Sequence, residues 1–335
     1  MIISKTPVRI AFGGGGTDVD PYASEFNGYV INSTINLYFR SILNERKDLR
    51  IFIYSNDKFT NYNFEKVQDI NKSQAALDLI KAILYYLKPT TGLDIYLHGE
   101  PPKKAGLGAS ASLSTSLIAG IMKLQKKIVD INEIAEAAFS VEQNILKNAG
   151  GRQDQYAAVY GGFNELKFLG NSNVKVSPIN IPNSFKKLIE QNIILFYTGE
   201  PHISGNLVQK QIDLYISRKE QSRKYLDRIK EIAFNMKDAL KSEDFNKLGN
   251  LLTDDWKVKT NFNPLITTEY MKELHSLVMK KGGIGGRVCG AGGGGSMIWL
   301  VNPNNRKQIA SILKNKLGFI IDFKFIEKGL EILNI

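Results

Sequence analysis

The chain has 335 residues, of which 43% are hydrophobic and 23% are charged, and its formal net charge is +11. A chain of this length buries a large core, and its charged fraction is ordinary for a globular protein, which excludes an intrinsically disordered chain. Cys289 is the only cysteine. A disulfide within the chain is therefore excluded, which fits a reducing compartment.

The excess of positive charge makes nucleic acid one class of partner to consider. The basic residues are interspersed with acids, however, as in residues 218–231 (RKEQSRKYLDRIKE), which is typical of a solvated helix face. No helix-turn-helix, zinc-finger or aromatic RNA-binding motif is present, so we predict no nucleic-acid partner. The N-terminal residues do not resemble a signal peptide, and no uncharged apolar run is long enough to cross a bilayer. We therefore expect a cytoplasmic protein without a membrane partner.

The first half of the chain predicts strands that alternate with helices. Alternating apolar residues and β-branching predict strands at KTPVRIAF and over residues 29–43, 49–55 and 92–99. Apolar residues at helical spacing predict helices over residues 73–87, 112–126 and 132–146. Ser73 and Asn132 are the expected N-caps of the first and third helices.

The second half repeats this mixture. We expect strands over residues 192–198, 296–302 and 319–326, and a helix over residues 305–316. A long amphipathic helix is predicted over residues 206–241, with an apolar stripe of Tyr225, Ile229, Ile232, Met236 and Leu240. Such a composition predicts an α+β protein of two layered domains. A polar stretch over residues 165–180 marks the boundary, which gives domains of residues 1–170 and 171–335.

The segment PPKKAGLGASASLSTSLIAG (residues 101–120) has the pattern of a phosphate-binding loop. Gly106 and Gly108 precede a helix that starts near Ser110 or Ser112, and a helix N-terminus offers free N–H groups and partial positive charge. The pattern matches neither the P-loop nor the dinucleotide-binding fingerprint. A glycine turn that only caps a packed helix is the alternative.

Two acidic residues follow in SVEQNILKNAGGRQDQYAAVYGGFN (residues 140–164). Phosphoryl transfer needs one carboxylate for Mg²⁺ and often another that orients or deprotonates the attacking hydroxyl. Glu142 and Asp154, brought back together by a glycine turn, could divide these roles. Taken alone, Glu142 is equally a solvated helix residue, and Asp154 could belong to a buried polar network.

Two further glycine-rich segments stand near the ends of the chain. In TPVRIAFGGGGTDVDPY (residues 6–22), a strand runs into four glycines, and Thr17 and Asp18 offer hydrogen bonds to hydroxyl groups. Arg9 is unusual inside a strand, because a buried arginine normally has an acidic partner. In RVCGAGGGGSMIWLV (residues 287–301), four glycines lead into a strand. The alternatives are a flexible hairpin in the first case and a hinge in the second.

The motifs TPVRIAFGGGGTD, PPKKAGLGASAS and CGAGGGGS, in this order, resemble those of the GHMP kinase superfamily. The resemblance spans nearly the whole chain. It implies a two-domain GHMP kinase fold, with an N-terminal domain like domain 2 of ribosomal protein S5 and a ferredoxin-like C-terminal domain. It also implies an active site between the two domains, with ATP and Mg²⁺ as cofactors.

The resemblance also implies roles for single residues. Ser110 and Glu142 match the family's Mg²⁺ ligands, Asp154 matches the acid that orients or deprotonates the acceptor hydroxyl, and Arg9 matches the basic residue beside that acid. The residues expected around ATP are Lys104, Gly106, Leu107, Gly108, Ala109, Ser110, Ala111 and Ser112. The residues expected around the substrate are Gly14, Gly15, Gly16, Thr17, Asp18, Asn32, Thr34, Gly293 and Gly294.

Within the superfamily, FGGGGTDVDPY, NSTIN and GGRQDQYAAVYGGFN most resemble the D-glycero-D-manno-heptose 7-phosphate kinases. That resemblance implies phosphorylation of the anomeric hydroxyl of a sugar phosphate, to give a 1,7-bisphosphate. Two positions depart from the family pattern: Ala109 replaces a serine of the middle motif, and His202 replaces an arginine.

Three other functions remain open from the sequence. The acceptor could be another sugar, such as fucose or galactose, or a mevalonate-type alcohol, although Thr17, Asp18, Asn32 and Thr34 are very polar for the latter. A catalytically silent sensor of ATP and sugar is the third. The sequence also leaves a homodimer open.

Overall fold

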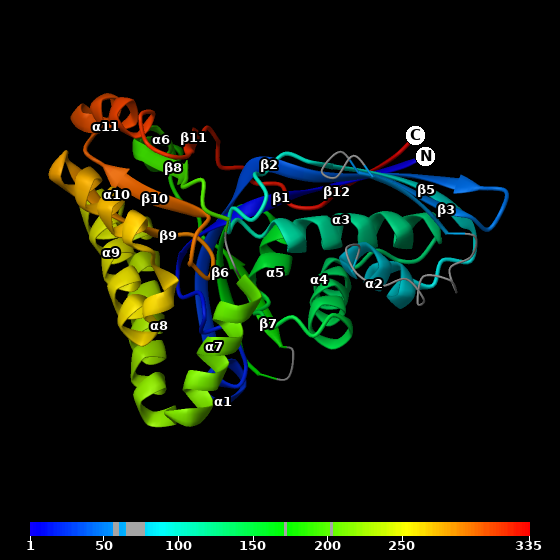
Figure 1. Cartoon of the computed structure of the whole chain (residues 1–335), viewed down its shortest axis with the longest axis horizontal. Coiled ribbons are helices and arrows are strands. Elements are labelled where there is room, and N and C mark those ends of the chain that lie inside the picture. Colours follow the sequence, from blue (N-terminus) through cyan, green and yellow to red (C-terminus); the bar gives the residue numbers. More distant parts are fainter. Residues whose placement is uncertain (56–59, 65–77, 171–172, 202–203) are drawn as a thin grey trace.

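The computed structural model describes residues 1–55, 60–64, 78–170, 173–201 and 204–335. It contains two sheets, one of eight strands and one of four. Both sheets carry helices, so the chain has the mixed two-domain architecture that the sequence predicts (Figure 1). Within the described residues, no helix is long and apolar enough to cross a membrane.

The larger sheet has the strand order β12-β1-β2-β5-β3-β4, and β6 and β7 extend it beside β2. Its strands are β1 (Ile2–Gly13), β2 (Gly28–Arg46), β3 (Ile51–Ser55), β4 (Thr60–Phe64), β5 (Gly92–Gly99), β6 (Phe163–Phe168), β7 (Val174–Pro178) and β12 (Glu331–Asn334). All neighbours are antiparallel except β3 and β5. β2 is long enough to pair with β6 through its first residues and with β5 through its last ones.

One face of this sheet is covered by helices, as Figure 1 shows. They are α2 (Asp78–Leu87), α3 (Ala109–Leu124), α4 (Ile131–Ser140) and α5 (Gln153–Tyr160). A short helix, α1 (Tyr22–Phe26), links β1 to β2. The buried residues between the sheet and these helices, among them Leu43, Ile95 and Ile118, form one apolar core that fixes α3 beneath β1 and β2.

The smaller sheet has the order β11-β8-β10-β9 and is antiparallel throughout. Its strands are β8 (Ile193–Tyr197), β9 (Gly283–Val288), β10 (Ser296–Val301) and β11 (Phe319–Ile321). The helices around it are α6 (Asn183–Asn192), α7 (Ser204–Ser217), α8 (Lys219–Lys241), α9 (Phe245–Phe262), α10 (Glu269–Lys280) and α11 (Arg306–Leu313).

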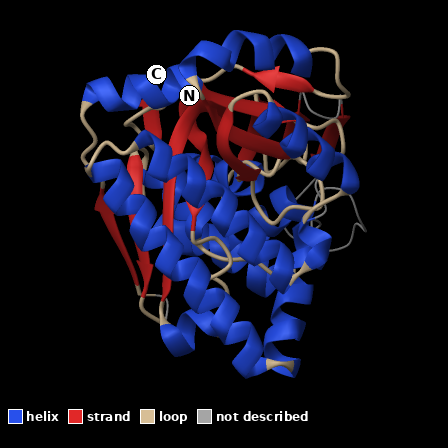
Figure 2. Ribbon diagram, turned by 90° about the vertical axis from the view of Figure 1, so that its left-hand side faces the viewer, coloured by secondary structure: helices blue, strands red, loops and turns tan. Residues whose placement is uncertain are grey.

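A second apolar core joins the two sheets. It combines Ile10 and Phe12 of β1 with Leu195 of β8, Ile298 of β10 and Met236 of α8. This shared core holds the end of β1 against the smaller sheet and its helices. The two ends of the chain also meet, since the Met1 amine donates to the Ile335 carbonyl at 3.0 Å (Figure 2).

Several elements differ from those predicted. The helix expected over residues 206–241 is two helices, because Arg218 leaves helical geometry with φ −138° and ψ 52°. The strand expected over residues 319–326 ends at Ile321, and Phe325 instead bridges to Ile35 of the larger sheet. Asn132 is not an N-cap. The side chain of Asp130 caps α4 by accepting from the backbone of Asn132 and Glu133.

The helix predicted over residues 132–146 ends its α-helical part at Ser140, and Val141–Ile145 form a π-helical turn, η2. Ser73, the other expected cap, lies outside the described residues. The division of the chain after residue 170 stays a prediction. The sheets group the chain differently, because β7 and β12 come from beyond that position and pair within the larger sheet.

Candidate active site

Arg9 and Asp154 form a partly buried ion pair between β1 and the first turn of α5. The Arg9 Nε donates to Asp154 Oδ1 at 2.7 Å, and its Nη2 donates to Oδ2 at 2.8 Å, so the contact is bidentate. The third donor, Nη1, bonds the carbonyl of Gly106 at 2.8 Å. The acidic partner that a strand arginine requires is therefore Asp154, and the pair fixes the orientation of this carboxylate.

The same arginine ties the middle glycine segment to β1. Its backbone N–H donates to the carbonyl of Leu107 at 3.0 Å, while its side chain holds Gly106. A Cβ on Gly106 would lie 2.8 Å from the Cys289 carbonyl, so this loop also lies directly against the last glycine-rich motif. Three motifs that are far apart in sequence thus meet at one point.

The phosphate loop, residues 106–112, ends in the N-terminus of α3. Gly108 is the N-cap, with the left-handed angles φ 78° and ψ 28°, which glycine adopts without steric cost. No side chain caps this helix, so its first N–H groups stay available to an anion. A Cβ on Gly108 would lie 3.2 Å from Asp154 Oδ2, which places the Arg9-bound carboxylate in contact with the phosphate loop.

Glu142 lies opposite the start of α3 on the π-helical turn η2. The Ser110 hydroxyl donates to its Oε1, and Gln155 Nε2 donates to its Oε2 at 2.7 Å. Burial raises the pKa of Glu142 from its ordinary 4.5 to about 7, and the negative charge of Asp154 adds to that rise. π-helical turns occur frequently at functional sites. The turn brings together the two residues expected to bind Mg²⁺.

The other residues predicted around ATP differ in how they lie relative to the loop. Lys104 is exposed beside the loop, and the backbone of residues 108–111 forms the helix start. Leu107 is fully buried and anchors the loop. Ser112 faces away from the loop, because its hydroxyl donates to the Thr6 carbonyl at 2.8 Å and its N–H donates to Gly108 O. The Ser112 side chain thus joins α3 to β1.

The acceptor loop, residues 13–18, follows β1 directly. Asp18 is buried, and it accepts bonds from the backbone N–H groups of Gly16 at 2.9 Å and Gln153 at 3.2 Å. Burial raises its pKa, with a further contribution from the Asp154 charge. A Cβ on Gly151 would lie 1.9 Å from Asp18 Oδ2, so only glycine fits there. The loop and the start of α5 are therefore held together beside Asp154.

The remaining residues predicted around the substrate differ in how their polar groups are used. The Thr17 hydroxyl bonds to the Gly14 and Tyr29 carbonyls, and the Thr34 hydroxyl bonds to the Ile326 carbonyl, so both bonds stabilise the fold. Asn32 is fully buried, and neither atom of its amide has a hydrogen-bond partner in the described part of the chain. Of these three polar groups, the Asn32 amide alone makes no hydrogen bond within the described residues.

The glycines of the last motif, residues 287–301, also pack against different parts of the protein. Gly290 packs on Gly106, so the start of the motif borders the phosphate loop. Gly293 and Gly294 face other segments: a Cβ on the first would meet Leu207 of α7, and a Cβ on the second would meet the Pro201 carbonyl at 2.8 Å. Their predicted contact with the substrate stays a prediction. His202 lies outside the described residues.

Sequence reasoning missed a buried charged cluster beside the acceptor loop. Asp255 of α9 lies 2.8 Å from Arg287 Nη1 and 3.6 Å from Lys259 Nζ, and its Oδ1 accepts from the Gly14 N–H at 3.2 Å. A signal was available in the sequence. The buried apolar residues Leu248, Leu252 and Phe262 follow a helical repeat that also includes positions 255 and 259. Two charged residues there occupy core positions of an amphipathic helix.

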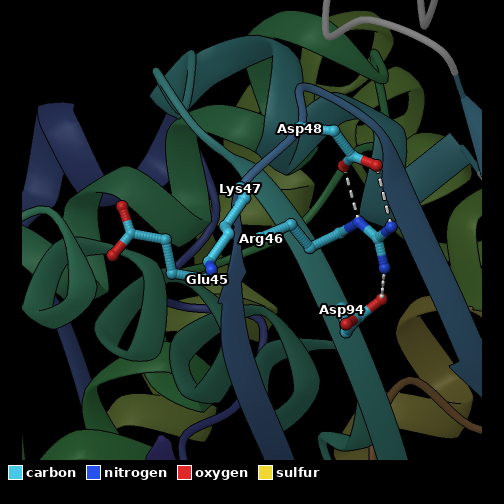
Figure 3. A pocket seen from close by; sticks show the side chains of 5 residues that line it. All are labelled: Glu45, Arg46, Lys47, Asp48 and Asp94. Carbon is cyan, nitrogen blue, oxygen red and sulfur yellow. Dashed lines mark hydrogen bonds and ion pairs between the residues drawn. The ribbon is translucent and has the colours of Figure 1, made fainter.

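A hollow at the far end of the larger sheet does not belong to this site. It is lined by Glu45, Arg46, Lys47, Asp48 and Asp94 (Figure 3). Arg46 is held there by two bonds to Asp48, at 2.8 and 2.9 Å, and by one to Asp94 at 2.8 Å. These bonds use the guanidinium donors of Arg46 on both sides. We therefore interpret the hollow as a surface network of ion pairs.

Comparisons with known proteins fit this geometry. The model of the GHMP kinases N terminal domain matches residues 73–162, and the model of the GHMP kinases C terminal domain matches residues 236–318. The first match contains the phosphate loop, Glu142 and Asp154. The second contains α9 and the last glycine motif.

Two curated relatives align over almost the whole chain. D-glycero-alpha-D-manno-heptose 7-phosphate kinase of Campylobacter jejuni is 29% identical and covers 98% of each chain. Mevalonate kinase of Pyrococcus abyssi is 24% identical and covers 99% of this chain and 98% of its own. Among solved structures, a D-glycero-D-manno-heptose 1-phosphate kinase from Bacteroides thetaiotaomicron is 26% identical, with a TM-score of 0.80 and coverage of 100% and 99%.

Proposed function

Since this chain belongs to the GHMP kinases, we propose that it transfers the γ-phosphate of ATP to the anomeric hydroxyl of a sugar phosphate. The acceptor we propose is D-glycero-D-manno-heptose 7-phosphate, and the product is the 1,7-bisphosphate. The names of the relatives from Campylobacter jejuni and Bacteroides thetaiotaomicron support a heptose phosphate. Because the reaction consumes ATP, we place it in the cytoplasm.

One observation carries the proposal: the Asp154 carboxylate lies in contact with the phosphate loop. Its Oδ2 is 3.2 Å from the Cβ position of Gly108, the N-cap of α3. A hydroxyl bound to Asp154 would therefore lie next to phosphates bound at the helix start. Phosphoryl transfer depends mainly on such positioning, with charge stabilisation around the transferred group.

Asp154 and Arg9 would act on the acceptor as a unit. The carboxylate accepts a hydrogen bond from the attacking hydroxyl and takes its proton as the bond to phosphorus forms. Arg9 holds both carboxylate oxygens and the Gly106 carbonyl, so it fixes the distance between acid and loop. A fixed distance matters because small misplacements at a reacting centre cost large factors in rate.

Ser110 and Glu142 fit a Mg²⁺ ion. Both offer oxygen ligands, and Mg²⁺ in phosphate-transfer sites takes one or two protein ligands besides phosphate oxygens and water. The Ser110 hydroxyl already bonds to the Glu142 carboxylate, so one ion could contact both. A bound Mg²⁺ would supply charge neutralisation at the ATP phosphates. Without the ion, burial raises the pKa of Glu142 to about 7.

The acceptor side favours a polyol over a mevalonate-type alcohol. Asp18, Asn32 and the Gln153 side chain are polar groups with little solvent exposure, and the Asn32 amide lacks a partner among the described residues. Buried polar groups that the fold leaves unpaired bind a ligand with matching hydroxyls and reject one without them.

A coupled assay of ADP release tests the proposal. The panel comprises D-glycero-D-manno-heptose 7-phosphate, the unphosphorylated heptose, D-galactose, L-fucose and mevalonate. We expect the highest kcat/KM with the heptose 7-phosphate, and a product in which the anomeric carbon carries the new phosphate by ³¹P NMR. A higher kcat/KM with mevalonate would overturn the sugar assignment. Absence of ADP release with every compound would overturn the kinase activity itself.

A further inference from the structure

Lys259 carries a buried ammonium group that makes few interactions with the rest of the described chain. It lies on α9, its side chain is only 8% exposed, and its nearest acceptor in the described part of the chain is Asp255 Oδ2 at 3.6 Å. That separation is longer than a hydrogen bond. Burial, together with the charge of Arg287, lowers the pKa of Lys259 to about 8. A buried charge with three donors and one distant partner is costly unless a ligand completes it.

Asp255 does not need Lys259 for neutralisation. Arg287 lies 2.8 Å from the same carboxylate, and the Gly14 N–H donates to its other oxygen. Arg287 in turn also bonds to the Phe12 carbonyl at 2.7 Å, so this arginine is committed to the fold. Asp255 Oδ2 makes no hydrogen bond with another described residue, and Lys259 faces the charges of both Asp255 and Asp18. The charges of this cluster therefore balance, but the Lys259 ammonium approaches Asp255 only to 3.6 Å.

The Lys259 ammonium converges with the Gln153 amide above Gly15. A Cβ on Gly15 would lie 3.3 Å from Lys259 Nζ and 3.1 Å from Gln153 Nε2. Gln153 Oε1 is buried and has no hydrogen-bond partner among the residues that the structure describes. Two polar side chains from different helices, α5 and α9, therefore converge on one spot, and each has hydrogen-bonding capacity left over.

The order of the groups along the site indicates which part of the acceptor lies beside Lys259. Asp154 lies at the phosphate loop, the next residue Gln153 is bonded to Asp18, and Lys259 approaches Gln153 at Gly15. An acceptor that reacts at Asp154 and has hydroxyls at Asp18 would place its far end at Lys259. In a sugar phosphate, the far end from the anomeric carbon carries the phosphate.

We propose that Lys259 binds the phosphate group that the acceptor already carries, and so sets the preference for a phosphorylated over an unphosphorylated sugar. This inference rests on the proposed kinase activity. Arg9 cannot take this role, because its donors are bound to Asp154 and Gly106. The unpaired Gln153 Oε1 is an acceptor, so it would bind a hydroxyl of the sugar and not the phosphate.

The test compares kcat/KM for D-glycero-D-manno-heptose 7-phosphate and for the unphosphorylated heptose in four proteins: wild type, Lys259→Met, Lys259→Arg and Lys257→Met. Lys257 is the matched control, because it lies on the same helix with a side chain 70% exposed. The ratio of the two constants does not depend on the fraction of protein that is folded, so a partly unstable variant still gives an answer.

We expect Lys259→Met to lower this ratio about tenfold or more, through a higher KM for the phosphorylated sugar, with KM for ATP unchanged. Lys259→Arg should retain part of the ratio, and Lys257→Met all of it. An unchanged ratio in Lys259→Met, or an equal loss with both sugars, would overturn the inference while leaving the kinase activity intact. If the wild-type protein turns over neither sugar, the proposed function fails first. The inference about Lys259 then fails with it.

Discussion

The two sides of the site bind by different means. At the phosphate loop, the groups offered to a ligand are backbone N–H groups at the start of α3, with Ser110 and Glu142 beside them. Around the acceptor loop, the groups are buried side chains from three separate elements, namely Asp18 after β1, Gln153 on α5 and Lys259 on α9.

This difference separates what is general in the reaction from what is specific. A phosphate chain can be bound by any helix start with the right glycines, since backbone N–H groups are present in every sequence. A sugar is distinguished by side chains that must be brought together from distant segments. We therefore expect changes at the phosphate loop to affect all substrates alike, and changes at the acceptor loop to affect one substrate more than another.

The largest effect is expected where the two sides meet, at Asp154. Asp154→Asn should lower kcat about 1000-fold, because the amide cannot take the proton of the attacking hydroxyl. ATP affinity, measured by equilibrium binding, should stay within a few-fold of wild type. The variant leaves the Arg9 charge without its partner carboxylate, so thermal melting must confirm that it is folded. Retention of wild-type kcat would contradict the role of Asp154.

Glu142 gives a prediction about stability and pH in the absence of Mg²⁺. Its pKa rises from 4.5 to about 7 in the folded protein, so folding is favoured more when Glu142 is protonated. Its contribution is therefore fully present below pH 4.5 and is lost as the pH rises through about 7. The loss amounts to at most about 3 kcal/mol.

Urea unfolding of the wild type and Glu142→Gln at pH 5 and pH 8 measures this effect. Relative to the wild type, Glu142→Gln should be more stable at pH 8 than at pH 5, because the amide does not ionise. If the difference in unfolding free energy between the two proteins were the same at both pH values, the raised pKa of Glu142 would be contradicted.

Ser110→Ala and Ser112→Ala test the phosphate loop as a matched pair two residues apart. Ser110→Ala should reduce kcat/KM for Mg·ATP about 10–100-fold, whichever sugar is the acceptor, because a metal ligand is lost. Ser112→Ala should leave these constants unchanged, since its hydroxyl bonds to the Thr6 carbonyl. Equal kinetic effects of the two substitutions would refute the assignment of Ser110.

Gly15→Ala tests the acceptor loop. The new methyl group would lie 3.1 Å from Gln153 Nε2 and 3.3 Å from Lys259 Nζ, where these side chains converge. We expect KM for the sugar phosphate to rise about tenfold while KM for ATP stays unchanged. Gly150→Ala is the control, because its Cβ would meet no atom within 4 Å. A rise in KM for ATP instead would mean that this loop belongs to the nucleotide site.

The smallest effect is the structural cost of Ser112→Ala. The hydroxyl donates to Thr6 O at 2.8 Å, inside the contact between α3 and β1. Its loss should lower the free energy of unfolding by about 1 kcal/mol, or somewhat more because a buried carbonyl loses its donor. Chemical unfolding measures the change, and a value near zero would show that the Thr6 carbonyl finds another donor.

Much of the site followed from local sequence signals. A glycine pair before a helix predicted the phosphate loop, because the left-handed geometry of Gly108 and the free N–H groups of α3 are local properties. An arginine inside a strand predicted an acidic partner, and Asp154 is that partner. The limits of elements were less predictable: the break at Arg218 follows no proline or glycine signal.

The roles of single hydroxyls were not predictable in the same way. Thr17 and Thr34 look like ligand-binding residues in sequence, yet their hydroxyls bond to backbone carbonyls of distant segments. Asp255 and Lys259 stand at core positions in the helical spacing of α9, but that spacing does not show which groups they meet. Their burial depends on how α9 packs against β9 and the end of β1.

The sequence by itself determined the α+β class and the order of the glycine motifs, and it predicts the residues for phosphate and metal binding, because these depend on backbone conformation and on residue type at fixed spacing. The tertiary structure alone decided which side chains converge on the acceptor. Gly15, Gln153 and Lys259 are each more than 100 residues apart in the sequence, and only the packing of α5 and α9 against β1 brings them to one place. A long-range contact of this kind is set by the shared core, and no local pattern encodes it.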